Sequence, residues 1–173
     1  MKNTKIISVC AVICALSTVL LLFGSVTQIM DLTMVALCSM LVTYSVIEIG
    51  GAWPWLVWAV TSLLSLLLLP DKFGGVVYLI FGGYYPMAKL FIEKRTKLVY
   101  GYLIKLVYFN MVLSVILLCG KYILLMPDDE ISLGIAAYVI CNPTFILFDF
   151  ALTRLITVYL IKFQKRFGLK IKK

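Results

Sequence analysis

Histidine is absent from this chain of 173 residues, and only 14% of its residues carry a charge. Without histidine, the chain lacks the commonest general base and the commonest metal ligand. Soluble domains carry roughly 25% charged and 45–50% apolar residues, whereas 63% of this chain is hydrophobic and its mean hydropathy is +1.07. This balance excludes a soluble enzyme and indicates a membrane protein, in which any chemistry lies inside a helical bundle or on a partner.

Catalytic motifs are also lacking. The sequence contains no HExxH, no GxSxG, no phosphate-binding loop and no pair of carboxylates placed to share one buried face. Its cysteines lie in apolar runs without a CxxC pair, so we interpret them as small packing residues and expect no disulfide. They are Cys10, Cys14, Cys38, Cys119 and Cys141. We therefore predict a protein that is not an enzyme and that holds no metal or cofactor.

Long apolar runs, separated by short polar or glycine-containing breaks, fill most of the chain. A helix needs about 20 apolar residues to cross the hydrocarbon core, so the length allows five or six spans. We expect six: 6–30, 32–47, a third that follows the break at 48–54 and ends before Pro70, then 73–91, 98–125 and 131–161. The prediction is an all-α protein with one six-helix transmembrane domain over residues 1–161 and a basic cytoplasmic tail over residues 162–173.

The positive charges gather on one side of the expected bundle. Six spans place both termini and the loop around Arg95 on the same side, where most of the lysines and arginines fall. The opposite turns carry Lys72 and Lys121 against Asp31, Asp71, Asp128, Asp129 and Glu130. The positive-inside rule therefore predicts a multi-pass protein of the cell membrane with both termini in the cytoplasm. We interpret the basic tail as a segment that lies on anionic lipid rather than on nucleic acid.

One acidic residue falls at membrane depth. Asp149 lies in the sixth expected span, where an ionisable side chain costs about 2.5–3.5 kcal/mol and needs a partner. We predict that Asp149 faces the bundle interior and forms an ion pair with Lys105, with Arg154 and Lys89 as the other candidates. Proton or ion coupling through Asp149 is the alternative interpretation.

Small residues mark two of the expected helices as surfaces for close approach. Ala11 and Ala15 lie one turn apart on the first span, and glycine doublets at 74–75 and 82–83 lie on the fourth, before Pro86. Small residues at this spacing let another helix approach closely. The alanines therefore serve either internal packing or the docking of a partner. The glycines serve either tight packing or a flexible segment that lines a substrate path.

Two polar residues are candidates for a binding pocket in the outer half of the bundle. Asn142 lies about 16 Å below Ile131 at 1.5 Å per residue, which places an amide near the middle of the bilayer. We predict that Asn142 and Tyr78 contact a substrate, because an amide at this depth needs hydrogen-bond partners. The alternative is that Asn142 satisfies the carbonyl that Pro143 leaves without a donor.

Two segments carry a resemblance to a known family. "NPTFILFDFALTRLI", residues 142–156, resembles the last helix of the substrate-binding S components of energy-coupling factor transporters, with Pro143, Phe145, Asp149 and Arg154 in matching order. "YLIFGGYYPMAKLFIEKR", residues 78–95, resembles the glycine-rich fourth helix of that family and its charged exit. The small pair on the first helix and the six spans with cytoplasmic termini fit the same pattern.

The resemblance implies a bundle that captures a vitamin or another small metabolite from outside. Such a subunit associates with a transmembrane coupling subunit, for which Ala11 and Ala15 would form the docking ridge, and with two cytoplasmic ATPases that hydrolyse ATP. Two other functions remain open: a membrane scaffold of a cell-envelope complex, and a small ion-coupled carrier centred on Asp149. A pocket lined by polar groups would favour capture over a scaffold, and water around Asp149 would favour the carrier.

Overall fold

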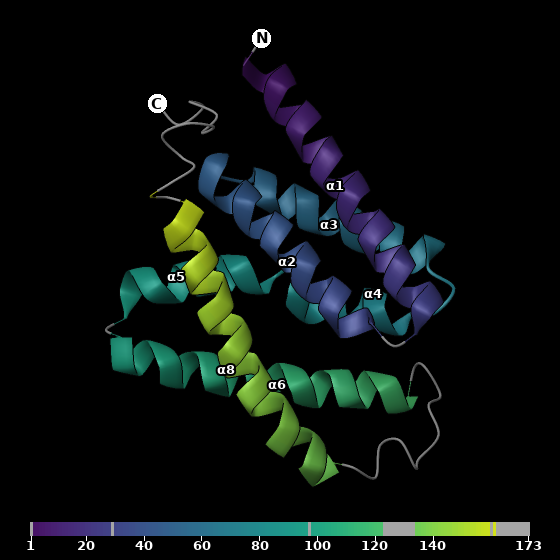
Figure 1. Cartoon of the computed structure of the whole chain (residues 1–173), viewed down its shortest axis with the longest axis vertical. Coiled ribbons are helices and arrows are strands. Elements are labelled where there is room, and N and C mark those ends of the chain that lie inside the picture. Colours follow the sequence, from purple (N-terminus) through teal and green to yellow (C-terminus); the bar gives the residue numbers. More distant parts are fainter. Residues whose placement is uncertain (1, 29, 97, 123–133, 160, 162–173) are drawn as a thin grey trace. The chain divides into compact units, whose positions relative to one another are not determined.

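A computed structural model describes residues 2–28, 30–96, 98–122, 134–159 and 161, and every element in these ranges is a helix (Figure 1). The helices are α1 (Lys2–Thr27), α2 (Asp31–Glu48), α3 (Trp53–Leu68), α4 (Phe73–Val77), the π-helix η1 (Tyr78–Gly82), α5 (Tyr85–Arg95), α6 (Leu98–Tyr122) and α8 (Gly134–Val158). The expected all-α class is confirmed for this part of the chain. The predicted tail at 162–173 lies outside the described residues.

Five helical stretches in the described part are long and apolar enough to cross a membrane. They are Thr4–Thr27, Asp31–Glu48, Phe73–Arg95, Tyr100–Leu118 and Tyr138–Val158. The remaining apolar helix, α3, has 16 residues and is shorter than the others. Several helices of the described part could therefore span a membrane, which fits the multi-pass membrane protein that the composition predicts. Helix α3 falls below the usual length of a span.

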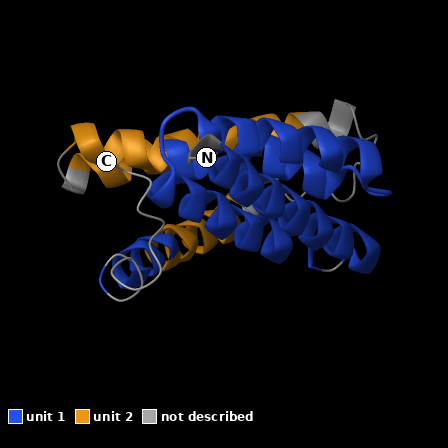
Figure 2. Cartoon of the chain, turned by 90° about the horizontal axis from the view of Figure 1, so that it is seen from above, with its two compact units in different colours: residues 1–87, 152–173 blue, residues 88–151 orange. Residues whose placement is uncertain are grey.

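The chain divides into two compact units (Figure 2). Unit 1 comprises Met1–Met87 and Leu152–Lys173, and unit 2 comprises Ala88–Ala151. In unit 1, α1 packs against both α2 and α3, and α4 and η1 pack against α2 and α3 as well. In unit 2, the end of α5 lies with α6 and most of α8.

Buried residues of unit 1 recur at helical spacing. On α2, Val35, Cys38 and Val42 are buried, and on α1 the buried positions include Ile13 and Leu21. The opposite faces of the same helices are also apolar and stay exposed. A helix that is hydrophobic all round is typical of a membrane span, because lipid can cover what the core does not. This pattern explains why these helices form without polar faces.

The π-helix η1 gives the fourth expected span its close fit to α2 and α3. A Cβ atom built on Gly82 would lie 2.4 Å from Val35 Cγ1, and one on Gly83 would lie 2.4 Å from Trp58 Cδ1, so only glycine fits at either position. In the wider π-helical turn, the Leu79 carbonyl accepts a hydrogen bond from Trp58 Nε1 of α3 at 3.0 Å. The second glycine doublet therefore serves tight packing within unit 1.

Polar contacts connect α6 and α8 in unit 2 in an antiparallel register. Ser114 Oγ and the Tyr138 hydroxyl lie 2.7 Å apart, and the Asn110 and Asn142 amides exchange two hydrogen bonds. Between these contacts and Asp149, Phe145 stacks on the Phe109 ring of α6 at a centroid distance of 4.3 Å. Rising numbers on α6 meet falling numbers on α8. Interhelical hydrogen bonds at fixed positions set the register of two spans that lipid alone would not align.

Candidate functional site

Tyr78 stands at the centre of a polar cluster inside unit 1. The residue comes from η1, is fully buried, and its hydroxyl lies within interaction range of the Thr61 hydroxyl on α3. Two thiols, Cys14 of α1 and Cys38 of α2, lie within electrostatic range of the same hydroxyl, and Ser17 lies beside Cys38. We call these five residues the hydroxyl–thiol cluster. It draws side chains from four elements of one unit.

Within the described residues, none of the cluster's hydroxyls makes a hydrogen bond of standard geometry, although the Thr61 hydroxyl lies close to Tyr78 and Cys14. Six buried hydroxyl oxygens share this property, and they belong to Ser17, Ser39, Ser45, Thr61, Ser62 and Tyr78. A buried polar group without a partner costs about 1–3 kcal/mol. Three of the six belong to the hydroxyl–thiol cluster. Convergent donors and acceptors that the protein itself leaves unpaired are the features of a site for a small polar ligand.

Other hydroxyls in the same helices are satisfied locally. Thr18 Oγ1 donates to the Cys14 carbonyl at 2.8 Å, and Thr43 Oγ1 donates to the Ser39 carbonyl at 2.8 Å. This bond to the carbonyl one turn earlier is the usual way in which an apolar helix accommodates a hydroxyl. The hydroxyls of Ser17 and Thr61 therefore differ from those of their neighbours, and the Thr61 hydroxyl lies close to that of Tyr78.

The hydroxyl–thiol cluster lies near the middle of two of its helices. Thr61 is eight residues from the start of α3 and seven from its end, and Cys14 is twelve residues from the start of α1 and thirteen from its end. Tyr78 follows the start of α4 by five residues. The sequence predicts a pocket in the outer half of the bundle with Tyr78 and Asn142, and of these two residues Tyr78 belongs to this cluster.

Four charged side chains form a second cluster, inside unit 2. Asp149 of α8 forms ion pairs with Lys89 of α5 and with Lys105 of α6, whose Nζ lies 3.1 Å from Asp149 Oδ2. Glu93, one turn after Lys89, accepts from Lys105 Nζ at 2.6 Å and lies 3.4 Å from Lys89 Nζ. Lys89 also donates to the Asp149 backbone carbonyl at 3.0 Å. We call these residues the four-charge cluster, which ties three helices together.

The four-charge cluster is buried except at Glu93. The side chains of Lys89 and Asp149 are 2% exposed and that of Lys105 is 5% exposed, whereas Glu93 is 44% exposed. Two ammonium groups against two carboxylates leave no net charge. Buried charges in this balanced arrangement hold helices in place, and removing one of them leaves another uncompensated.

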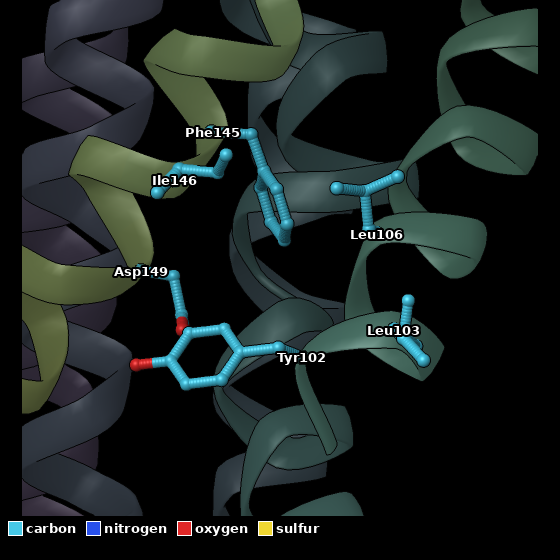
Figure 3. Close-up of a pocket in the computed structure, with 6 residues that line it drawn as sticks. All are labelled: Tyr102, Leu103, Leu106, Phe145, Ile146 and Asp149. Atoms are coloured by element: carbon cyan, nitrogen blue, oxygen red, sulfur yellow. The ribbon is translucent and has the colours of Figure 1, made fainter. Parts of the chain in front are cut away.

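A small apolar recess lies beside Asp149. It has a volume of about 150 Å³ and is lined by Tyr102, Leu103, Leu106, Phe145, Ile146 and Asp149. Figure 3 shows the Tyr102 ring from α6 and the Asp149 side chain from α8 at its edge. Most of the apolar lining residues are exposed on the surface. The recess is therefore a shallow apolar depression on the surface and not a polar pocket.

The residues predicted from sequence fall into separate surroundings. Asp149 and Lys105 come together, with Lys89 as an additional partner that was only a secondary candidate. Tyr78 lies in unit 1, whereas Asn142 lies in unit 2 and bonds to Asn110 and to the Tyr138 carbonyl. Pro143 has no N–H to donate to the Val139 carbonyl, one turn earlier. The Asn142 amide does not replace that donor, because it donates to the neighbouring Tyr138 carbonyl.

Ala11 and Ala15 are exposed on α1, one residue after the buried positions Cys10 and Cys14. Three components of the two clusters were not predicted from the sequence: Glu93, Thr61 and Ser17. Glu93 follows Lys89 by four residues, a spacing that indicates an ion pair on one helix face. Thr61 gave no signal, because single hydroxyls are common in apolar helices.

Comparisons with family models, curated proteins and solved structures found no match to this chain. The resemblance to S components therefore depends on the two quoted segments alone. Fold and site together define a class: a helical protein of the multi-pass membrane type, with one buried cluster of unpaired hydroxyls and one buried cluster of balanced charges.

Proposed function

We propose that this chain is the substrate-capture subunit of an energy-coupling factor type transporter, which binds a small polar nutrient in the cell membrane. The observation that carries the proposal is the set of unpaired, buried hydroxyls around Tyr78. A scaffold has no use for polar groups that it leaves unsatisfied at membrane depth. A bound solute with several hydrogen-bonding groups gives them partners and gains selectivity from them.

The proposal includes six spans with both termini in the cytoplasm, and α3 as the shortest of them. Two contacts within unit 1 support alternating spans. The Tyr159 hydroxyl donates to Glu48 at 2.7 Å, which brings the end of α8 to the end of α2. Ser25 exchanges hydrogen bonds with the Asp71 backbone, which brings the end of α1 to the turn before α4. Both pairings follow from an up-and-down order of spans.

The four-charge cluster favours capture over ion coupling. A carrier centred on Asp149 needs that carboxylate to meet water or an ion, and here two lysines occupy it instead. Energy for uptake would therefore come from partners: a transmembrane coupling subunit and two cytoplasmic ATPases. The hydroxyl–thiol cluster, rather than Asn142, is the binding site in this proposal, because the Asn142 amide already has protein partners.

We predict that the wild-type protein copurifies with a small polar molecule and that Thr61→Val loses it. The protein is extracted in mild detergent, denatured, and the released small molecules are identified by mass spectrometry. Thr144→Val is the matched control, because its hydroxyl is exposed and bonds to the Ile140 carbonyl. The same molecule in equal amounts on wild type, Thr61→Val and Tyr78→Phe would contradict the assignment of this site.

The exposed alanines of α1 are the docking ridge in this proposal. Replacing Ala11 and Ala15 together by leucine should abolish copurification with the coupling subunit, because larger side chains prevent close backbone approach. Thermal stability should change little, since both positions are exposed. A double replacement of Val12 and Val19 by leucine, also on exposed positions of α1, is the control. Retained copurification with lost stability would show that the alanines pack internally instead.

A further inference from the structure

The recess beside Asp149 lies between α6 and α8, and both helices are long and apolar enough to cross a membrane. The Phe145 ring lines the recess as a buried side chain, whereas Leu103, Leu106 and Ile146 line it as exposed ones (Figure 3). Its volume is about 150 Å³, and an apolar cavity of roughly that size takes up a guest such as benzene. On the surface of a membrane span, the apolar guest at hand is the acyl chain of a lipid.

The depth of the recess fits the upper part of an acyl chain. Helix α6 begins at Leu98, and the residues that it gives to the recess run from Tyr102 to Leu106. At 1.5 Å per residue, they lie about 6–12 Å from the start of the helix. The headgroup layer of a bilayer is about 5–8 Å thick on each side, so acyl chains begin at this depth. Exposed tyrosines at positions 100 and 102 are typical of such a boundary.

Two basic side chains lie at the same end of unit 2. Lys94 and Arg95 are the last residues of α5, and both are exposed. Among the ion pairs of the described residues, none involves either of them. Glu93, the acidic residue beside them, pairs with Lys89 and Lys105 of the four-charge cluster. This end of unit 2 therefore presents positive charge that the described part of the chain does not balance.

The basic pair is close to the recess. A Cβ atom built on Gly101 would lie 3.2 Å from the hydroxyl oxygen of Thr96. Gly101 precedes Tyr102, which lines the recess, and Thr96 follows Arg95 directly. The start of α6 thus packs on the residue that follows the basic pair, and a single molecule can reach both the recess and the two cations.

We propose that unit 2 binds one anionic phospholipid, with an acyl chain in the recess and its phosphate on Lys94 and Arg95. A guanidinium group forms paired hydrogen bonds with phosphate oxygens, and basic residues at a membrane surface attract anionic lipid. The charge pattern predicts that this turn faces the cytoplasm, where the leaflet is rich in anionic lipid. The site is separate from the hydroxyl–thiol cluster and does not depend on solute capture.

The test reconstitutes the wild-type protein in vesicles of equal parts phosphatidylglycerol and phosphatidylcholine, and then extracts and washes it in mild detergent. Lipid that stays with the protein is taken into organic solvent, apart from any polar solute, and counted by mass spectrometry. We expect about one phosphatidylglycerol per chain and at least about tenfold less phosphatidylcholine, because each of the two basic residues contributes roughly a fivefold preference.

Two pairs of variants separate the headgroup contact from the recess. Replacing Lys94 and Arg95 together by glutamine should make the retained amounts of the two lipids equal, whereas Lys5→Gln, at an exposed lysine of α1, should keep the preference. Ile146→Trp should fill the recess and retain neither lipid. Leu147→Trp, at the next position and outside the recess, should retain phosphatidylglycerol as wild type does. All these positions are exposed, so the thermal midpoint should change little.

Four results would overturn the site. Wild type without retained phosphatidylglycerol would leave the recess to another occupant, such as a partner helix. Equal retention of both lipids by wild type would show that the basic pair selects no headgroup. Unchanged preference in the double glutamine variant would move the headgroup elsewhere. Retention by both Ile146→Trp and Leu103→Trp, a second change that fills the recess, would show that no acyl chain lies there.

Discussion

Replacing Asp149 by asparagine should lower the free energy of unfolding by about 3–5 kcal/mol, because two buried ammonium groups lose their shared carboxylate. Among the ion pairs of the described residues, Glu93 would then be the remaining carboxylate beside Lys89 and Lys105, and it is half-exposed. The measurement is thermal or denaturant unfolding in detergent. Lys5→Met, at an exposed position of α1, is the control and should change stability little.

A double-mutant cycle separates the ion pairs from simple loss of packing. Asp149→Asn combined with Lys105→Met should cost less than the sum of the two single changes, because no lone charge is then left at that contact. We expect a larger coupling for Lys89→Met, because Lys89 forms the closer and more deeply buried of the two ion pairs with the Asp149 carboxylate. Additive effects in both cycles would refute the four-charge cluster as a unit.

Gly83→Ala and Gly82→Ala should each destabilise the protein by about 1–3 kcal/mol or more, because both overfill a packed interior. The added methyl group would lie 2.4 Å from Trp58 in the first case and 2.4 Å from Val35 in the second. Intrinsic helix propensity acts in the opposite direction, since alanine is favoured over glycine by about 1 kcal/mol. The predicted sign therefore depends on the contacts alone.

Gly75→Ala is the matched control for these two variants. Its methyl group would meet Ser65 Oγ at 3.3 Å, a contact that a small shift relieves. We expect its unfolding midpoint to stay close to that of wild type. If Gly83→Ala were as stable as Gly75→Ala, the close fit of η1 against α3 would be wrong.

The helices and the ion pair at Asp149 could be predicted from the sequence because they depend on simple constraints. Apolar runs of fixed length form helices in lipid, and a carboxylate at membrane depth needs a cation. Lys105 could be chosen by matching depths along two antiparallel helices. Lys89 could be named only as a secondary candidate, because the π-helix η1 changes the rotation of every later residue in α5, and no residue pattern predicts such a turn.

The hydroxyl–thiol cluster was only partly predictable. Tyr78 was expected in a pocket, but Ser17 and Thr61 were not. Most hydroxyls in an apolar helix bond to their own backbone, as Thr18 does, so their presence alone indicates nothing. Only the arrangement of α1, α3 and η1 distinguishes the hydroxyls that are left unpaired. The outcome for Asn142 follows the same rule: its bonding depends on Asn110, which lies on another helix.

The most direct test of solute capture is the intact mass of the wild-type protein, measured by native mass spectrometry after mild extraction. We predict a species heavier than the bare chain by one small molecule, which Thr61→Val and Tyr78→Phe lose while Thr144→Val keeps it. The contrary result is the bare mass for wild type together with a higher unfolding temperature for Thr61→Val. The unpaired hydroxyls would then be unsatisfied groups inside a packed scaffold, and not a binding site.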